Sequence, residues 1–268
     1  MNAAPTSRDR DERLKRIALP VILIASVIFV WEFVVRLKQI PPYVLPAPSL
    51  VIETLVADWG LLSRSLVVTL TTTVEGFALA AIGGIALAVL FSRSRRVEYS
   101  LYPFAVILQV TPVIAIAPLL LVYLQQQTAV LVCAWIVAFF PVLANTTLGL
   151  NSVDRNLADL FSLYGASSSQ NLWRLKLPSA LPYMLGGLRI AGGLSLIGAV
   201  AAEIAAGSAG AGSGLAFRIS ESQYRLNIPR MFAALLLLSV TGIVIFYVLS
   251  LISHLALRRW HESALDER

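Results

Sequence analysis

Two features of the sequence could support catalysis. One is the tripeptide Gly212-Ser213-Gly214, and the other is His254, which lies near the end of an apolar stretch. A serine activated by a histidine is a nucleophile, and six-span intramembrane serine proteases use such a pair. However, Ala211 stands where a Gly-x-Ser-Gly pattern requires glycine. About twenty residues of helix, or ~30 Å, should also separate Ser213 in an outer loop from His254. We therefore expect no enzymatic activity.

The residues present also argue against nucleotide hydrolysis and metal chemistry within this chain. Every lysine is preceded by leucine, so the Gly-Lys-Ser/Thr step of a phosphate-binding loop is absent and the chain cannot itself be the ATPase. The histidines are His254 and His261, and the single cysteine, Cys133, lies in an apolar stretch. Because no ligand cluster can be assembled from them, we expect neither a metal nor a cofactor.

Three charged residues fall within apolar stretches: Glu75, Arg189 and Glu203. Charges inside a membrane are candidates for function. Arg189 lies near the inner end of its stretch and can extend its guanidinium to the membrane surface. Glu203 lies beside the glycine-containing segment Gly207–Gly214 and can hold a turn. Glu75 is placed more deeply, so either a solute pathway or a hydrogen bond between helices would explain it.

The elements that carry these residues are membrane spans. The chain has 268 residues and 13% of them are charged, whereas a soluble domain has roughly 25%. A span needs about 20 apolar residues. Six segments qualify: Ile17–Val35, Leu66–Phe91, Phe104–Leu124, Thr128–Leu150, Tyr183–Ala206 and Met231–Leu257. We therefore predict an all-α integral membrane domain of six transmembrane helices over residues 17–257, with tails at 1–16 and 258–268.

Basic residues predict the orientation of these spans. With the N-terminus inside, one side receives fourteen basic residues and the other six. The first set is Arg8, Arg10, Arg13, Lys15, Arg16, Arg93, Arg95, Arg96, Arg155, Arg174, Lys176, Arg258, Arg259 and Arg268; the second is Arg36, Lys38, Arg64, Arg218, Arg225 and Arg230. Because such residues stay cytoplasmic, both termini should face the cytoplasm. The net charge of +6 then reflects topology and contact with the anionic lipid bilayer, with no nucleic acid as partner.

The third predicted span carries three prolines, Pro103, Pro112 and Pro118, each of which should bend the helix. Irregular backbone in a membrane packs inside protein or lines a cavity, so this span is our candidate for a pathway wall. It ends near Gln125, the first of three glutamines, which mark either a polar turn or an outer mouth. A short amphipathic helix at the outer interface is predicted for Ser49–Trp59.

Small residues at four-residue spacing predict close packing of the second and fifth spans rather than a pore. The rows are Ala80, Gly84 and Ala88 in one span and Gly187, Ala191, Ser195 and Ala199 in the other.

A polar segment, residues 151–182, separates the fourth and fifth spans. Four apolar residues with i, i+3, i+4, i+7 spacing predict one face of a short helix: Leu157, Leu160, Phe161 and Tyr164. Gly165 can supply the left-handed residue that ends a helix. Ser167 and Gln170 form a capping-box pattern for a second helix, which Pro178 should end. The two helices either lie on lipid headgroups or dock into a groove on a partner protein.

This segment resembles the cytoplasmic coupling loop of ABC importer permeases. The resemblance rests on Gly165-Ala166-Ser167 followed by Leu177-Pro-Ser-Ala-Leu-Pro182. Other motifs fit the same pattern in the same order from about Leu45 to Leu257: Leu45-Pro-Ala-Pro-Ser49, Gly76-Phe-Ala-Leu-Ala80, Thr111-Pro112 with Pro118, Phe140-Pro141 with Asn145-Thr146, Gly187-Leu-Arg-Ile-Ala191 and Ala202-Glu203. The last two are similar to the subfamily that imports nitrate, sulfonates, taurine and pyrimidine precursors of thiamine.

The resemblance implies a type I permease of a bacterial inner-membrane importer. It also implies ABC ATPase subunits, an extracytoplasmic substrate-binding protein and a second permease copy, identical or paralogous, as partners. ATP-driven closure of the ATPase subunits would switch the spans between inward- and outward-open states. The residues that the resemblance assigns to ATPase coupling are Asp159, Leu160, Phe161, Gly165, Ala166 and Pro178.

Two departures from the family pattern concern function. The usual Glu-Ala-Ala is replaced by Asp159-Leu160-Phe161, which keeps the acid and adds bulk, so the ATPase groove should be altered. The usual Trp-Phe-Gly-like turn is replaced by Tyr123-Leu-Gln-Gln-Gln127. A small anion and a small heterocycle both remain compatible cargoes. A self-contained secondary transporter, the remaining alternative, would usually show inverted repeats and a midplane ionisable pair, and neither is evident.

Overall fold

The computed structural model describes residues 7–207 and 212–258, and in this part of the chain every regular element is helical. Five of its helices are apolar and long enough to cross a membrane, and a bent pair can form a sixth span. The five are α1 (Ser7–Leu37), α3 (Trp59–Arg93), α6 (Gln126–Asn151), α9 (Leu177–Ala206) and α11 (Ile228–Leu257). The predicted all-α membrane fold is confirmed, and the count of six holds when the bent pair is one span.

The third predicted span, Phe104–Leu124, is broken rather than continuous. It consists of α4 (Arg95–Val110) and α5 (Val113–Tyr123), whose axes meet at 99°. Thr111 and Pro112 are extended at the break, because a proline disfavours helical backbone in the residue before it. Pro103 and Pro118 lie inside helices. Only one of the three prolines therefore marks the break.

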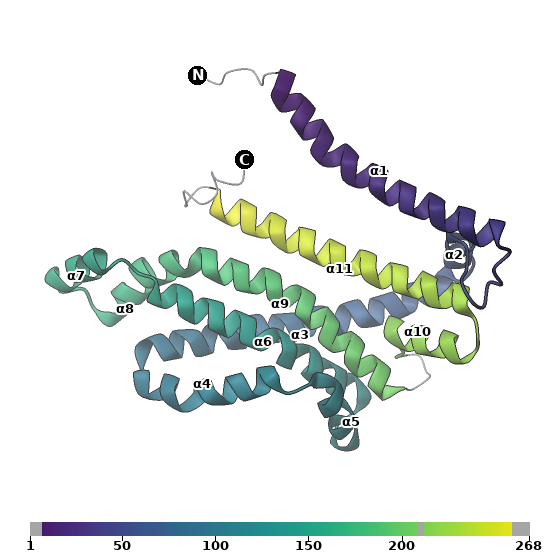
Figure 1. Cartoon of the computed structure of the whole chain (residues 1–268). Coiled ribbons are helices and arrows are strands. Elements are labelled where there is room, and N and C mark those ends of the chain that lie inside the picture. Colours follow the sequence, from purple (N-terminus) through teal and green to yellow (C-terminus); the bar gives the residue numbers. More distant parts are fainter. Residues whose placement is uncertain (1–6, 208–211, 259–268) are drawn as a thin grey trace.

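The centre of the bundle is α6, which packs against both α3 and α9 (Figure 1). Both rows of small residues are buried. A Cβ added at Gly84 would lie 3.0 Å from Val142, and one added at Gly187 would lie 2.8 Å from the Cβ of Asn145. The predicted role of these rows in close packing is confirmed.

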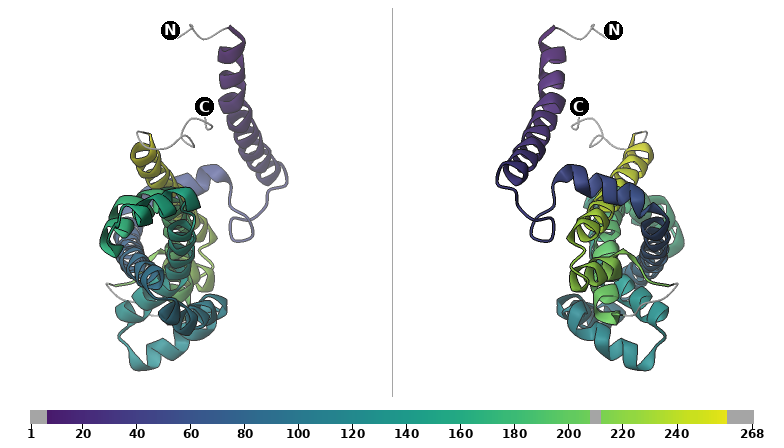
Figure 2. Two further views of the ribbon diagram at one scale, coloured as in Figure 1. Left: turned by 90° about the vertical axis from the view of Figure 1, so that its left-hand side faces the viewer. Right: turned by 90° about the vertical axis from the view of Figure 1, so that its right-hand side faces the viewer.

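The short helices gather at opposite ends of the bundle. At one end lie α2 (Pro48–Ala57) and α10 (Leu215–Tyr224); at the other lie α7 (Arg155–Leu163) and α8 (Ser168–Asn171) (Figure 1). The predicted short helix after the first span exists as α2, although Trp59 already belongs to α3. The start of α1 and the end of α11 lie towards the α7 end, and α1 diverges from the other helices (Figure 2).

Pro178 does not end the second helix of the polar segment, so that prediction was wrong. A five-residue π-helix, η1 (Leu172–Lys176), joins α8 to α9, and Pro178 lies in the first turn of α9. The backbone stays helical through Lys176 and Leu177, so Pro178 removes a donor from a continuing helix. Local π geometry is a known way to absorb such an interruption. The fifth span is consequently part of one helical run from Ser168 to Ala206.

Candidate coupling surface and membrane polar network

The helix α7 presents an uncovered apolar face. Asp154 caps its N-terminus, with its carboxylate accepting from the backbone N–H of Asn156 at 2.7 Å. No residue of α7 is buried. Leu157 and Leu160 are 47% and 45% exposed, and Tyr164 at the C-terminal cap is 84% exposed. The predicted helical face is therefore present: within the described part of the chain Leu157, Leu160 and Tyr164 are exposed, whereas Phe161 is half-buried.

The turn after α7 has the geometry of a Schellman cap. Gly165 has φ +64° and donates its N–H to the carbonyl of Ser162 at 3.0 Å, while Ala166 donates to Phe161 at 2.9 Å. These two bonds satisfy carbonyls that a helix end leaves open. A Cβ at Gly165 would meet nothing within 4 Å. Glycine is thus favoured at position 165 by the positive φ, whereas the space around it would accommodate a side chain.

The second helix begins at the predicted capping box. Ser167 accepts from the N–H of Gln170 at 3.2 Å, and the Gln170 side chain accepts from the N–H of Ser167 at 2.8 Å. The following π-helix buries Leu172 and Leu175, and Leu172 packs in the same core cluster as Ala180 of α9. The exposed helix α7, called the knob below, is therefore connected through α8 to η1, its base, which is packed into the bundle.

At the opposite end, Glu203 of α9 holds the start of α10. Its side chain is buried, 4% exposed. One carboxylate oxygen accepts from the hydroxyl of Thr69 of α3 at 2.8 Å and the other from the backbone N–H of Ala216 at 3.0 Å. The Thr69 oxygen in turn accepts from the N–H of Leu215 at 2.8 Å. These bonds join α3, α9 and α10, as expected if Glu203 holds the turn between α9 and α10. Residues 208–211 of that turn lie outside the described part of the chain.

Gly214 completes this network by leaving room for the carboxylate. A Cβ at Gly214 would overlap the carboxylate group of Glu203, which its hydrogen-bond partners hold in place. Sequence reasoning missed Thr69, Gly214 and a second tie, in which the Arg218 guanidinium donates to the Ser65 hydroxyl at 3.0 Å. A glycine before a short helix was the available signal, but Thr69 lies 134 residues from Glu203.

Glu75 and Arg189 are placed differently from Glu203. Glu75 is exposed on α3, and in the described part of the chain no hydrogen bond or ion pair is found for it, so the alternative of an inter-helix hydrogen bond within one chain is not supported. Arg189 lies twelve residues into α9, or about 18 Å along its axis. It is half-buried, and its Nε is buried without a partner.

The remaining candidates surround the broken span. Pro112 and Pro118 are exposed, while α5 itself packs against α9 and α6. Gln125 occupies the N-cap position of α6 without a capping hydrogen bond from its side chain, and it is exposed. The structure thus places the coupling candidates at one end of the bundle and Glu203 at the other, and it does not bring them into one site.

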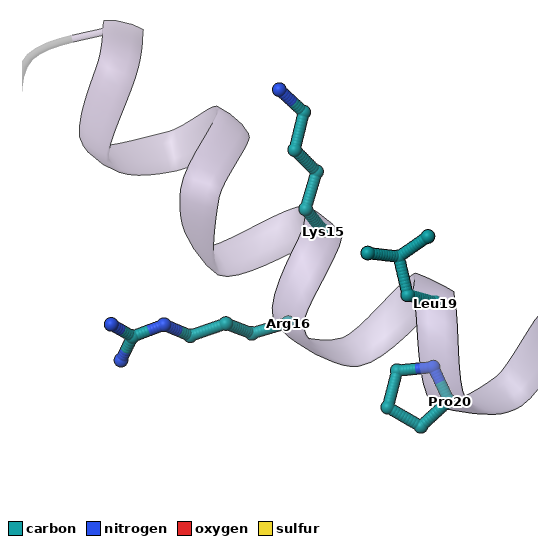
Figure 3. A pocket seen from close by; sticks show the side chains of 4 residues that line it. All are labelled: Lys15, Arg16, Leu19 and Pro20. Carbon is teal, nitrogen blue, oxygen red and sulfur yellow. The ribbon is translucent and has the colours of Figure 1, made fainter.

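A hollow beside α1 is lined by Lys15, Arg16, Leu19 and Pro20, all from that single helix (Figure 3). The two basic side chains extend away from the helix at the point where it changes from charged to apolar. This arrangement is typical of a membrane boundary, where basic side chains reach the headgroups. Among the described residues, no second element lines this hollow.

The protease alternative is not supported. Ser213 precedes α10, whereas His254 lies 26 residues beyond the start of α11 at Ile228, about 39 Å along the helix. Taken together, the bent third span, the tightly packed α3, α6 and α9, and the exposed α7 define a membrane-embedded helical bundle with a short helix exposed at one end.

Comparison with known proteins identifies the family. Residues 80–260 match the family described as the binding-protein-dependent transport system inner membrane component. The chain belongs to this family: it is a transmembrane permease subunit of an ABC importer, a multi-pass membrane protein and not an enzyme. Membership implies separate ATPase and substrate-binding protein partners.

Curated relatives cover nearly the whole chain. A probable ABC transporter permease protein of Haemophilus influenzae is 32% identical over 89% of this chain and 96% of its own. The formylaminopyrimidine transport permease protein ThiX of Halalkalibacterium halodurans is 34% identical over 89% and 94%. The riboflavin transport system permease protein RibX of Chloroflexus aurantiacus is 31% identical over 92% and 91%.

The fold also matches a solved structure. The crystal structure of an amino acid ABC transporter with histidines superposes with a TM-score of 0.63, at 18% identity, and covers 75% of this chain and 96% of that one. This likeness concerns the fold.

Proposed function

We propose that α7 and the turn at Gly165 dock into a groove on an ABC ATPase subunit at the cytoplasmic side. The observation that carries this proposal is the uncovered apolar face of α7 on a base packed into the bundle. Asp159 is exposed as well, but it lies on the opposite side of α7, outside that face. A helix face laid into a groove is a common mode of recognition.

The connection from this knob to the membrane suggests how ATP hydrolysis is coupled to transport. Because α8, η1 and α9 form one helical run, a displacement of the knob is carried directly into the fifth span. Closure of two ATPase subunits would draw two such knobs together and tilt each α9. In each permease subunit, α7 would move together with the ATPase subunit to which it is bound and transmit that movement to α9.

A second permease copy is needed to cover α3. Glu75 is exposed between Val74 and Ile82, which are 53% and 70% exposed. A carboxylate facing lipid at this depth is costly. We therefore assign this face of α3 to the pathway or to the interface with the second copy, and Pro112, Pro118, Gln125 and Arg189 remain further pathway candidates.

For the cargo, we propose a small nitrogen heterocycle of the vitamin-precursor type rather than an inorganic anion. The relatives named for formylaminopyrimidine and riboflavin transport are 34% and 31% identical over 89% and 92% of this chain. A nitrate import permease is 28% identical over 86% of it, and a bicarbonate transport permease is 36% identical over only 55% of it. An exposed carboxylate at Glu75 would also repel an anion nearby. Uptake of formylaminopyrimidine, but not of nitrate, by proteoliposomes carrying the complete importer would agree, and the reverse result would refute the cargo class.

The docking assignment is tested at Gly165. Gly165→Asp should leave the protein in the membrane, with ATP hydrolysis no longer producing uptake, because a charge is added to the docked turn. Gly165→Asn is the matched control, since asparagine has nearly the same size as aspartate and a similar tolerance of the left-handed conformation, but carries no charge. Uptake by the Asp variant equal to that of the Asn variant would rule out this contact.

The orientation is tested with a single reporter cysteine. Leu163 is 85% exposed, so Leu163→Cys in a Cys133→Ala background should react with a membrane-impermeant maleimide in inside-out vesicles only. Reaction in right-side-out vesicles would place the knob outside and contradict the proposal.

A further inference from the structure

A polar cavity of about 280 Å³ lies where the end of α3 meets the start of the α8–η1–α9 run. Its basic side chains are Arg93 and Lys176, and its hydroxyls include those of Ser168 and Ser169. No acidic residue is among the described residues that line it. Two cations and several hydroxyls without a carboxylate are the donor set that binds a phosphate group.

The donors in this cavity are largely unused by the described part of the chain. Within that part, Lys176 donates only a long bond, 3.5 Å, to the backbone carbonyl of Ser92, and no ion pair is found for Arg93. The buried Oδ1 of Asn171, which also lines the cavity, has no donor among the described residues. A ligand that carries both a phosphate and a hydroxyl would satisfy the cations and this acceptor together.

The position of the cavity indicates the source of the phosphate. Arg93 ends α3, whose last buried residue is Phe91. Ser168 and Ser169, which line the cavity, belong to α8, and α8 lies at the α7 end of the bundle (Figure 1). This is the level at which a span emerges into the headgroups. Anionic lipids are attracted to basic residues placed there.

We propose that this cavity binds the phosphodiester headgroup of an anionic phospholipid, with Arg93 and Lys176 on the phosphate and Asn171 accepting from a headgroup hydroxyl. The bound lipid would join the end of α3 to the base of the coupling segment. The lipid site is tested by measuring lipid binding to this protein alone, so the proposal does not depend on whether α7 docks onto an ATPase subunit.

The test is lipid titration of the full-length protein in neutral detergent, followed by native mass spectrometry. The probes are phosphatidylglycerol, phosphatidylethanolamine with the same acyl chains, and inorganic phosphate. Arg93→Gln/Lys176→Gln should weaken phosphatidylglycerol binding about tenfold, the size expected for losing charge-assisted bonds. Arg95→Gln/Arg96→Gln removes the same charge from exposed neighbours and should change binding less than about twofold.

Equal losses in the two double variants would overturn the site, because binding would then follow overall charge. If millimolar inorganic phosphate displaces the lipid, the cavity is a phosphate-binding site, but its ligand is a free anion and the proposed lipid is overturned. If Lys176→Gln impairs folding, Arg93→Gln alone decides, since this exposed side chain can be removed without loss of packing. An unchanged affinity in a folded Arg93→Gln protein would contradict the proposal.

Discussion

The two ends of the bundle are built on different principles. At the α2–α10 end, a buried polar network joins the helices: Thr69, Glu203 and the start of α10 share three hydrogen bonds. At the α7 end, apolar side chains are left uncovered on a short, well-capped helix. The first arrangement fixes three helices to one another, whereas the second leaves a surface for another molecule.

This difference separates stability from coupling. Removing one member of a buried network leaves its partners unsatisfied and costs about 1–3 kcal/mol per group. Substitutions on an exposed surface usually change stability by less than about 0.5 kcal/mol. Mutations at the α10 end should therefore destabilise the protein, and mutations in α7 should spare folding while affecting the partner.

The largest effect on stability is expected for Glu203→Ala. It leaves the Thr69 hydroxyl and the N–H of Ala216 without their acceptor, so we expect a loss of about 3 kcal/mol. Glu203→Gln keeps one carbonyl acceptor and should lose about half as much. Equilibrium unfolding in detergent measures both, and a wild-type midpoint for the alanine variant would show that the network is not needed.

Gly214→Ala should come next, at about 2 kcal/mol, because its new methyl overlaps the Glu203 carboxylate in a packed site. Gly212→Ala is the control, since a Cβ there meets nothing within 4 Å. The same unfolding measurement compares them. Equal stabilities of the two alanine variants would mean that the carboxylate can move aside.

A smaller effect is expected for the ion pair between Arg230 and Asp58. Arg230 bonds both carboxylate oxygens, at 2.6 and 3.1 Å, and joins the start of α11 to the α2–α3 junction. Both side chains are 22% exposed, so Arg230→Met should cost only about 1 kcal/mol, reduced further by salt. The measurement is the dependence of this difference on ionic strength. A loss as large as that of Glu203→Ala would show that this partly exposed pair is as important as the buried network.

The smallest effect on stability is expected in α7. Leu160→Glu should change the unfolding free energy by less than about 0.5 kcal/mol, because Leu160 is 45% exposed and no residue of its helix is buried. A large destabilisation would show that α7 packs on the bundle and is not a free surface.

The sequence was sufficient for features that depend on neighbouring residues. Apolar runs predicted the spans, the i, i+3, i+4 spacing predicted α7, and Gly165 and Ser167 predicted its boundaries with α8. Features that depend on distant residues could not be predicted, since pairing Thr69 with Glu203 requires the packing of α3 on α9. The prolines show the same limit: Pro112 breaks the third span and Pro178 is absorbed by a π-helix, although the residue type is identical.

The contrast between the ends is tested most directly by measuring, on the same proteins, the unfolding midpoint and the affinity for the ATPase subunits. Leu160→Glu should reduce ATPase binding at least about tenfold, with an unchanged midpoint. Ser162→Glu, an equal charge on another face of α7, should change neither. Glu203→Gln should lower the midpoint and leave the affinity of the folded fraction unchanged. Normal ATPase binding by a folded Leu160→Glu protein would contradict the account.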